Sequence, residues 1–460
     1  MKHLSVSSIV GSKGIDMSGS CSVEYKTVVC PQVMAPSAKH HVMAAIRNAG
    51  STTLKGMLAH SVGNVSLAYH WKELSGNFVV WDDGARAPIL ADFPPGGEAI
   101  LFLSVVPPST EGTFVLQLTL VSEEGWFEAQ GPTTHEIVVD IRAPSPSERE
   151  RLRRAAVEIS ALDSEGEAMR VFVVEQATGI WGNNSQQTSY YKMNARRYAA
   201  TARILQNRIG PGPLRVLNIG YSPIWSLLLR TYLPLWEQHH GDIQLNPMLV
   251  PAQRPSRGSS DVELRPVLAP AQGSPPLLVD RVDMFDAEKD RFPYEDGFFD
   301  VVIVAELIEH LLLDPMFTVS EANRVLKMGG SLVVTTPNVA RLDAVKSLLE
   351  HGGDHPFTCS AYAEKGHHRE YTPAEIQLLL VAGGFGIDFF DTFNVWPLRW
   401  STPVLEETFA LLEKTGYPTT WRGQDVVAVG KKEGTIRYRR PWPLYLTAET
   451  TTVVCETDYE

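Results

Sequence analysis

The sequence has few cysteines, no excess of positive charge and no long apolar run. Its 460 residues include four cysteines, with neither a CxxC pair nor a disulfide framework. The formal net charge of −12 argues against a nucleic-acid-binding surface. No run approaches the roughly 20 apolar residues that span a bilayer, and the N-terminus has no apolar leader. We therefore expect a cytoplasmic protein with no transmembrane segment and no nucleic-acid partner.

The chain is long enough for two or three domains. Residues 1–32 are rich in Ser and Gly and predict a flexible N-terminal tail. Residues 33–143 contain short runs of alternating apolar and polar side chains, such as 114–121, separated by turn signals such as Pro-Pro-Gly-Gly at 94–97. This spacing predicts an all-β sandwich.

The remaining chain predicts a helical linker over 144–185, an α/β domain over 186–432 and a C-terminal extension over 433–460. The clearest pattern is the β-branched run 301–304, which is typical of a strand buried on both faces of a parallel sheet.

A helix over 320–327, a left-handed stop at Gly329-Gly330 and a second buried strand over 331–335 follow that run. Together these segments predict one βαβ unit.

The segments FDVV (299–302), EHL (309–311) and RVLKMGG (324–330) resemble the signature of class I S-adenosylmethionine (SAM) methyltransferases. The resemblance implies an α/β fold with a Rossmann-like seven-stranded sheet whose last strand, here 425–432, is antiparallel. It also implies SAM as cofactor and methyl transfer as the reaction.

The sandwich region contains phrases, such as IRNAG (46–50), that look like the immunoglobulin-like domain attached to enzymes of bacterial surface-polysaccharide assembly. This likeness implies O-methylation of a sugar hydroxyl in a surface polysaccharide or its precursor. The partners would be a glycan or sugar-containing acceptor and glycan-assembly enzymes. Trp71, Trp81 and Trp126 either stack on sugar rings or fill the core.

In class I methyltransferases the first strand ends in a glycine-rich turn that lets the backbone approach the cofactor. Gly220 takes the place of the first glycine, and Tyr221 follows it. Asn218 replaces the usual acid and Ser222 replaces the second glycine, so the cofactor site is recognisable but degenerate.

An acid at the end of the second strand normally binds the ribose hydroxyls. We place that strand at 241–247, so Gln244 stands in the acid's position. Asp261 or Glu263, within an insertion expected to be a surface loop, are the alternatives.

The third-strand region resembles the family more closely. On that match Asp286 accepts the adenine amino group and the Ala287 backbone meets the ring; the structural alternative for Asp286 is a helix N-cap. Ala305 and Glu306, just past the fourth strand, would line the cofactor pocket.

A sugar hydroxyl needs a base to remove its proton. His310, beside Glu309, is one candidate, and His367 with Glu370 is the other. The second pair lies in HHREYTP (367–373), similar to a phrase of polysaccharide-type methyltransferases. The phrase also contains a capping box, Thr372 to Glu375.

No metal site is predicted, because no HExxH-like spacing is present. The histidines and the acid that a metal-dependent alternative would use are His351, Asp354, His355, His367 and His368.

Two other functions remain open. A decayed scaffold or glycan-binding protein would explain Asn218, Ser222 and Gln244. A small-molecule O- or N-methyltransferase would use the sandwich for oligomerisation alone.

Overall fold

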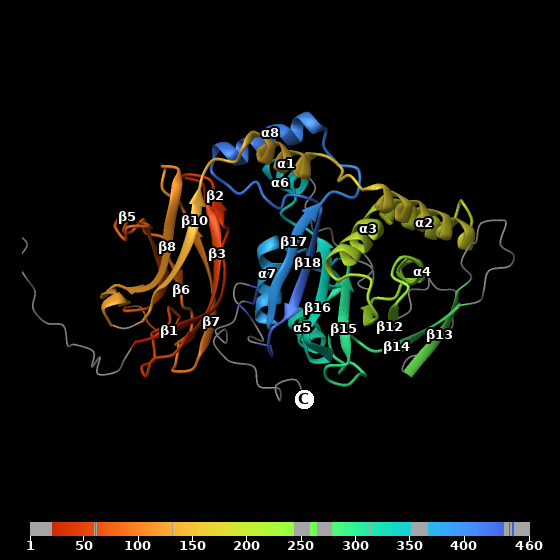
Figure 1. The fold of residues 1–460 in the computed structure, drawn as a ribbon, viewed down its shortest axis with the longest axis horizontal. Helices are drawn as coiled ribbons and strands as arrows, with labels where there is room; N and C mark the ends of the chain where they lie inside the picture. Colours follow the sequence, from red (N-terminus) through yellow and green to blue (C-terminus); the bar gives the residue numbers. More distant parts are fainter. Residues whose placement is uncertain are drawn as a thin grey trace, which may run out of the picture.

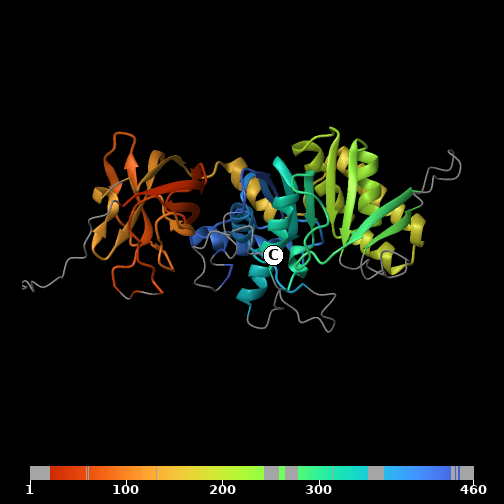
Figure 2. The same ribbon diagram turned by 90° about the horizontal axis from the view of Figure 1, so that it is seen from below.

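The computed structural model describes residues 21–242, 258–264, 278–350, 367–436, 441, 444 and 445, apart from 59, 61, 131 and 313. An all-β part comes first in the chain, and an α/β part follows it. Figures 1 and 2 show the two parts side by side. None of the described helices is long and apolar enough to cross a membrane.

The N-terminal part is built from short strands. They are β1 (Val23–Val29), β2 (Val33–Met34), β3 (His40–Asn48), β4 (Ser66–Glu73), β5 (Phe78–Val80), β6 (Ala87–Pro88), β7 (Glu98–Val105), β8 (Gly112–Ser122), β9 (Gly125–Trp126) and β10 (His135–Ile141). One sheet has the order β1-β3-β7, and the other has the order β2-β10-β8-β4-β5, with β6 and β9 paired at its side. Side chains from both sheets share one apolar core, in which Trp71 is fully buried.

Part of the region predicted to be a flexible tail forms strand β1. The sequence predicts flexibility over 1–32, but Val23–Val29 pairs antiparallel with β3. The alternation along β1 is real, with Val23 buried and Glu24 exposed. It covers only seven residues and adjoins a Ser- and Gly-rich stretch, which hides it in the sequence.

Three helices follow the all-β part along the chain: α1 (Pro146–Val157), α2 (Ser164–Trp181) and α3 (Gln186–Arg208). Each begins after a residue whose side-chain oxygen accepts a backbone amide of the first turn. Helix α1 lies against α8 (Thr402–Lys414), where Arg149 pairs with Glu413 at 2.6 Å.

The C-terminal part is built on a mixed sheet with the order β13-β14-β12-β11-β15-β16-β18-β17. Its strands are β11 (Leu214–Ile219), β12 (Trp236–Asp242), β13 (Gly258–Leu264), β14 (Leu278–Met284), β15 (Phe299–Ala305), β16 (Leu326–Pro337), β17 (Phe385–Phe393) and β18 (Asp425–Lys432). Seven of them form the expected mixed sheet, with β18 antiparallel to β16. The eighth, β13, pairs antiparallel with β14 where the sequence predicts a surface loop.

Helices cover both faces of this sheet. The remaining ones are α4 (Pro223–Tyr232), α5 (Pro315–Val325), α6 (Leu342–Leu349) and α7 (Pro373–Ala382). Val301 and Ile303 of β15 pack with α2, α3 and α4, whereas Val302 and Val304 pack with α5 and α7. The β-branched run is therefore buried on both faces, as predicted.

The βαβ unit differs from the prediction at its glycines. Helix α5 already ends at Val325, and Leu326 begins β16 by pairing with Phe299. Gly329 has a φ of +75° within this strand, where the register with β15 shifts. The pair of glycines thus accommodates an irregularity in a strand, and the helix has no left-handed cap.

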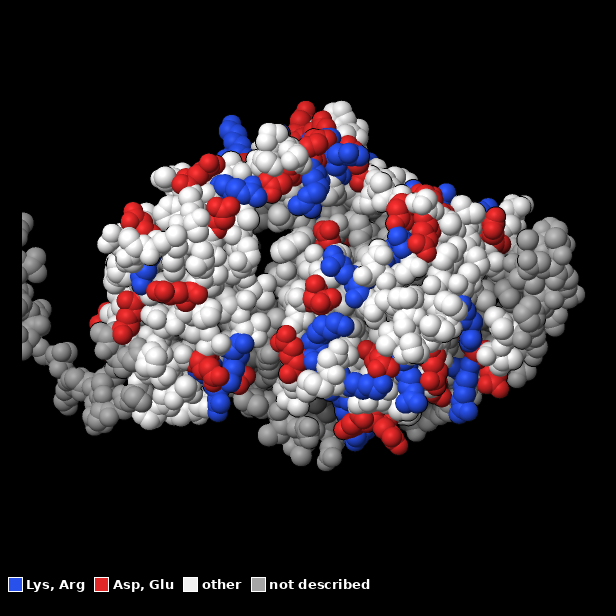
Figure 3. Space-filling model, in the orientation of Figure 1, with Lys and Arg blue, Asp and Glu red and all other residues white. Residues whose placement is uncertain are grey.

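The sheet β1-β3-β7 is also buried on both faces. Val42 and Ala44 of β3 lie in the core between the two N-terminal sheets. Met43 and Ala45 belong instead to the apolar cluster of the α/β part. The backbone amide of Lys39 donates to the Gly416 carbonyl at 2.8 Å, so the two parts also meet through hydrogen bonds. On the face shown in Figure 3, acidic and basic side chains alternate without a large patch of one sign.

Candidate functional site

The carboxyl ends of the parallel strands β11, β12, β14, β15 and β16 lie along one edge of the sheet. Asp425, the first residue of antiparallel β18, pairs with Pro337 at the end of β16 and so lies on the same edge. Ligands of open α/β sheets bind at this edge. Most of the predicted cofactor residues that the structure describes lie at or just after one of these strand ends, whereas His367 and Glu370 come from the segment before α7.

The turn after β11 is built around Gly220. Its φ is +88°, a conformation that favours glycine, and its amide donates to the Gly241 carbonyl at 2.9 Å. The next amide, that of Tyr221, donates to Oδ2 of Asp242 at 3.0 Å. The carboxylate that ends β12 is therefore held directly beside the glycine turn.

The second strand, which was expected to end in the ribose-binding residue, lies earlier in the chain than predicted. The strand predicted at 241–247 runs from Trp236 to Asp242, so it ends where the prediction begins. Gln244 lies outside the described residues. Residues Glu237 to His240 are polar, so the sequence of β12 lacks the apolar pattern expected of an inner strand. The strand nevertheless lies between β14 and β11 in the sheet.

The alternatives for the ribose site lie on β13. Asp261 is exposed and lies opposite Arg281 in the register of β13 with β14, and Glu263 lies opposite Val279. Both positions are away from Met284, where β14 reaches the carboxyl edge.

The other polar residues of the turn support it through their side chains. Oδ1 of Asn218 accepts the Trp225 indole N–H at 3.0 Å. Ser222 caps α4, and its hydroxyl lies 3.0 Å from that of Tyr191. The Tyr221 hydroxyl donates to Asp280 at 3.0 Å. All three side chains are buried, and these bonds fix the shape of the turn.

Asp286 follows β14 and stabilises a tight turn. Its carboxylate accepts the Glu288 amide at 2.9 Å and pairs with Lys289 at 3.0 Å. Ala287 is buried, and its carbonyl accepts the Thr318 hydroxyl at 2.8 Å. Both residues lie at the expected edge. Asp286 accepts an amide two residues along the chain, which stabilises a turn, but no helix begins there and the residue is therefore not a helix N-cap.

Glu306, directly after Ala305 at the end of β15, is held in an unusual backbone conformation with a φ of +52°. Its carboxylate accepts from Arg197 of α3 at 2.7 Å and from the Thr335 hydroxyl at 2.8 Å. Asp425 is fully buried on the same edge, and burial followed by the charge of Glu306 raises its pKa well above the usual value.

Glu309 and His310 form a single turn of 3-10 helix, η2 (Ile308–His310). Glu309 is fully buried, and its Oε2 accepts the Thr336 hydroxyl at 3.0 Å. Burial, followed by the charge of Glu306, raises the pKa of Glu309 well above its usual value. The His310 ring lies 5.0 Å, centroid to centroid, from the ring of His367. The structure thus brings both predicted base candidates together.

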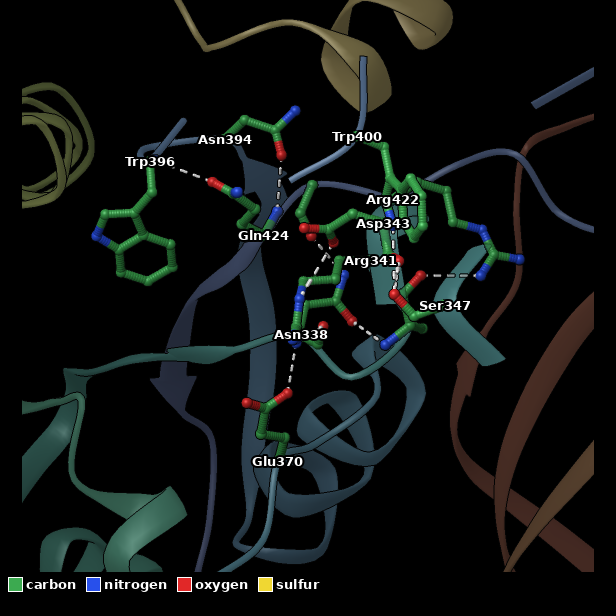
Figure 4. Close-up of polar contacts among 12 residues, drawn as sticks. Asn338, Arg341, Asp343, Ser347, Glu370, Asn394, Trp396, Trp400, Arg422 and Gln424 are labelled. Atoms are coloured by element: carbon green, nitrogen blue, oxygen red, sulfur yellow. Dashed lines mark hydrogen bonds and ion pairs between the residues drawn. The ribbon is translucent and has the colours of Figure 1, made fainter. Parts of the chain in front are cut away.

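Glu370 orients His367. Its Oε1 lies 3.4 Å from Nδ1 of His367, and its other oxygen accepts from Arg341. Burial alone would raise the pKa of Glu370, but the His367 hydrogen bond and the Arg341 charge lower it. Figure 4 shows Glu370, Arg341 and Asn338 in one polar network.

The segment around His367 is fixed by backbone bonds as well. The amides of His368 and Arg369 donate to the Glu309 carbonyl at 2.7 and 3.2 Å. Thr372 and Glu375 form the predicted capping box at the start of α7. His351, Asp354 and His355 lie outside the described residues.

Sequence reasoning missed Asp242, Arg197 and Asp425 as residues of this edge. Asp425 carried one signal, since a charged residue opens the predicted last strand. Arg197 carried none, because a lone arginine on a helix usually faces solvent.

Comparison with known proteins bears on the same region. A family model described as a methyltransferase domain matches residues 267–334. A probable S-adenosylmethionine-dependent methyltransferase of Mycolicibacterium smegmatis is 34% identical over 116 residues. The match covers 25% of this chain and 39% of that protein.

Two solved structures, both SAM-dependent methyltransferases, are also similar. The one from Archaeoglobus fulgidus is 18% identical, with a TM-score of 0.32, and the match covers 51% of this chain and 93% of that one. The one from Aquifex aeolicus is 12% identical, with a TM-score of 0.28, and the match covers 50% and 88%. From the family match and the curated relative, we conclude that the C-terminal half of the chain contains a class I SAM-dependent methyltransferase domain, whose cofactor is SAM.

Proposed function

We propose that this chain is a SAM-dependent O-methyltransferase acting on a sugar hydroxyl of a surface polysaccharide or its precursor. The observation that carries the proposal is the Asp242 carboxylate, held by the Tyr221 amide beside the Gly220 turn. A carboxylate at the end of this strand is the group expected to accept the ribose hydroxyls of SAM.

The turn fits the cofactor. Among the described residues, only Leu307 Cδ1 comes within 4 Å of the place where a Cβ on Gly220 would lie, at 4.0 Å. Helix α4 begins at Pro223, directly after Ser222, so its N-terminal end adjoins the turn. A close backbone approach and a helix N-terminus suit a charged, nucleoside-containing ligand.

SAM, when bound, supplies an electrophilic methyl group. The protein's task is to align the acceptor oxygen with it and to remove a proton. His367 is the base that we favour, because Glu370 faces its Nδ1 at 3.4 Å and thereby leaves Nε2 for the acceptor. His310 lies beside it and is the second candidate.

The sandwich supports a sugar-containing acceptor. Trp71 fills the core, but Trp81 is 45% exposed and neighbouring Phe78 is 44% exposed. The Trp81 ring stacks on His70 at 4.2 Å, so it is held in a fixed orientation. Exposed, rigid aromatic faces of this kind are suited to stacking against sugar rings. We include the immunoglobulin-like character of this part in the proposal.

Methyl-labelled SAM incubated with the full chain and a bacterial cell-envelope polysaccharide fraction tests the proposal. We expect label in an O-methyl sugar after acid hydrolysis, and less label with His367→Gln. Trp81→Ala should weaken glycan binding, whereas Val79→Ala on the preceding strand β5 should not. Label that appears only in small molecules would support the small-molecule alternative, and SAM binding without any transfer would support the scaffold.

A further inference from the structure

Three side chains at the proposed acceptor end of the site converge. Glu309 and His310 come from the turn η2 after β15, and His367 comes from the segment before α7. One carboxylate oxygen and two imidazole nitrogens from these residues lie within 4.8 Å of one another. Residues distant in sequence thus present three metal-ligating atoms to one point.

The Glu309 carboxylate supplies an independent observation. The side chain is fully buried, and Thr336 satisfies Oε2 at 3.0 Å. Oε1 has no hydrogen-bond partner within the described part of the chain and lies 3.9 Å from Nε2 of His310. A buried, unsatisfied carboxylate oxygen is costly, so it calls for a bound proton or a cation.

Two of the neighbouring acids have close cationic partners, and Glu309 does not. Glu306 pairs with Arg197, and Glu370 pairs with Arg341. Among the described residues, no Lys or Arg nitrogen lies within 4.0 Å of the Glu309 carboxylate. A cation between Glu309 and the two histidines would offset a charge that the protein leaves without a close counterion.

We propose that Glu309, His310 and His367 bind a divalent transition-metal ion. Two imidazoles and one carboxylate suit Zn²⁺, Mn²⁺, Fe²⁺ or Co²⁺ better than Mg²⁺ or Ca²⁺, which prefer oxygen ligands throughout. Three protein ligands leave coordination positions for water or for acceptor oxygens. The site therefore deepens the proposed methyltransferase function and rests on it for its role. With Nε2 of His367 on the ion, this histidine would no longer serve as the base, and the ion would instead lower the pKa of an acceptor hydroxyl bound to it.

The surrounding residues fit a metal centre. Glu370 faces Nδ1 of His367 at 3.4 Å, which leaves Nε2 to bind the ion, and Thr336 fixes the second oxygen of Glu309. Such outer partners orient metal ligands and set the histidine tautomer. The backbone bonds from His368 and Arg369 to the Glu309 carbonyl also hold the two ligand segments together.

A Co²⁺ titration of the metal-free full chain, followed by visible absorption, tests the proposal, with Zn²⁺ as competitor. We expect one ion per chain, with ligand-field bands that Zn²⁺ removes. Loss of an outer partner already weakens metal binding about 10–100-fold. Glu309→Gln, His310→Gln and His367→Gln should therefore each weaken it by at least about 100-fold. His368→Gln, a histidine next to the site but outside the three-ligand group, is the matched control and should leave the affinity unchanged.

His310 and His367 are partly exposed, so their variants should fold, and circular dichroism of each variant checks this. Equal Co²⁺ affinity in the wild type and the folded His367→Gln variant would overturn the proposal. So would loss of binding in His368→Gln alone. SAM titrations of the same samples separate the two proposals, because SAM binding without metal binding refutes only the metal site, and the reverse refutes only the cofactor site.

Discussion

The guanidinium of Arg197 lies 2.7 Å from Oε2 of Glu306 and ties helix α3 to the first residue after β15. Both side chains are nearly buried, and Glu306 keeps a φ of +52° at this position. The ion pair and the Thr335 hydrogen bond offset that backbone strain. The pair therefore fixes the carboxyl edge of the sheet at the point where cofactor and acceptor would meet.

Arg197→Met should destabilise the methyltransferase domain by about 3–5 kcal/mol, because it leaves Glu306 buried without its partner. Urea unfolding of the variant measures this loss. Arg170→Met is the matched control, since it removes a pair on α2 whose side chains are 36% and 39% exposed. That change should cost at most about 1 kcal/mol. Equal effects of the two substitutions would refute the structural role of Arg197.

Gly220→Ala should weaken SAM binding as well as stability. A non-glycine residue at a φ of +88° costs about 1–2 kcal/mol, and the methyl group would intrude on the proposed cofactor turn. Gly329→Ala introduces similar backbone strain, at a φ of +75°, at a site where nothing described lies within 4 Å of the new Cβ. Calorimetry should show reduced SAM affinity for the first variant alone. Unchanged affinity in Gly220→Ala would argue against cofactor binding at this turn.

His240 should make β12 sensitive to acid. Its ring is buried, and burial lowers its pKa to about 4, although Asp280, 3.8 Å away, opposes the shift. Arg230 and His239 also act on the ring, and both favour its neutral form. The unfolded chain binds a proton near pH 6.5 that the folded chain binds only near pH 4, so stability falls as the pH drops through this interval.

Between pH 7 and pH 5 this difference amounts to about 2 kcal/mol. Hydrogen exchange of the β12 amides in the wild type and in His240→Phe measures it, because the comparison at each pH cancels the intrinsic exchange rate. We expect the protection of the wild type to fall more steeply with acid. Parallel pH profiles would show that His240 is not the cause.

Asn338→Ala should loosen the polar network at the end of β16. The side-chain amide donates to the carbonyls of Trp421 and Gly423 at 3.0 and 2.7 Å, and its oxygen accepts the Ala340 amide at 2.9 Å. Removing these bonds leaves buried backbone groups without hydrogen-bond partners, which lowers stability by about 1–3 kcal/mol for each group. Thermal unfolding should show a clear loss, whereas Asn183→Ala, a change in an exposed loop, should have little effect. No loss in Asn338→Ala would mean that water replaces these bonds.

Local patterns predicted much of the fold. The β-branched run at Val301–Val304 and the capping box from Thr372 to Glu375 depend on neighbouring residues, so they are readable in the sequence. Strand β12 was misplaced because its polar residues lack the apolar signature of an inner strand, although it lies between β14 and β11. That misplacement is the reason that the sequence predicted Gln244 as the ribose contact, where we propose Asp242.

The candidate site was predicted only in part for a different reason. Arg197, Glu306 and Asp425 interact across three distant elements, and no local pattern marks such a group. His310 and His367 were each recognised from the sequence motifs around them. Their proximity, however, depends on how the segment before α7 lies over η2. Long-range charge pairing is set by the fold, so only the structure reveals it.

Calorimetric titration of SAM into the purified full chain, with Asp242→Asn beside the wild type, tests the account most directly. We predict saturable binding that weakens about 10–100-fold in Asp242→Asn, the loss expected when hydrogen bonds to a charged group become neutral. Asp286→Ala tests the adenine contact in the same experiment. No binding at millimolar SAM by a folded wild-type sample would contradict the account and favour a scaffold.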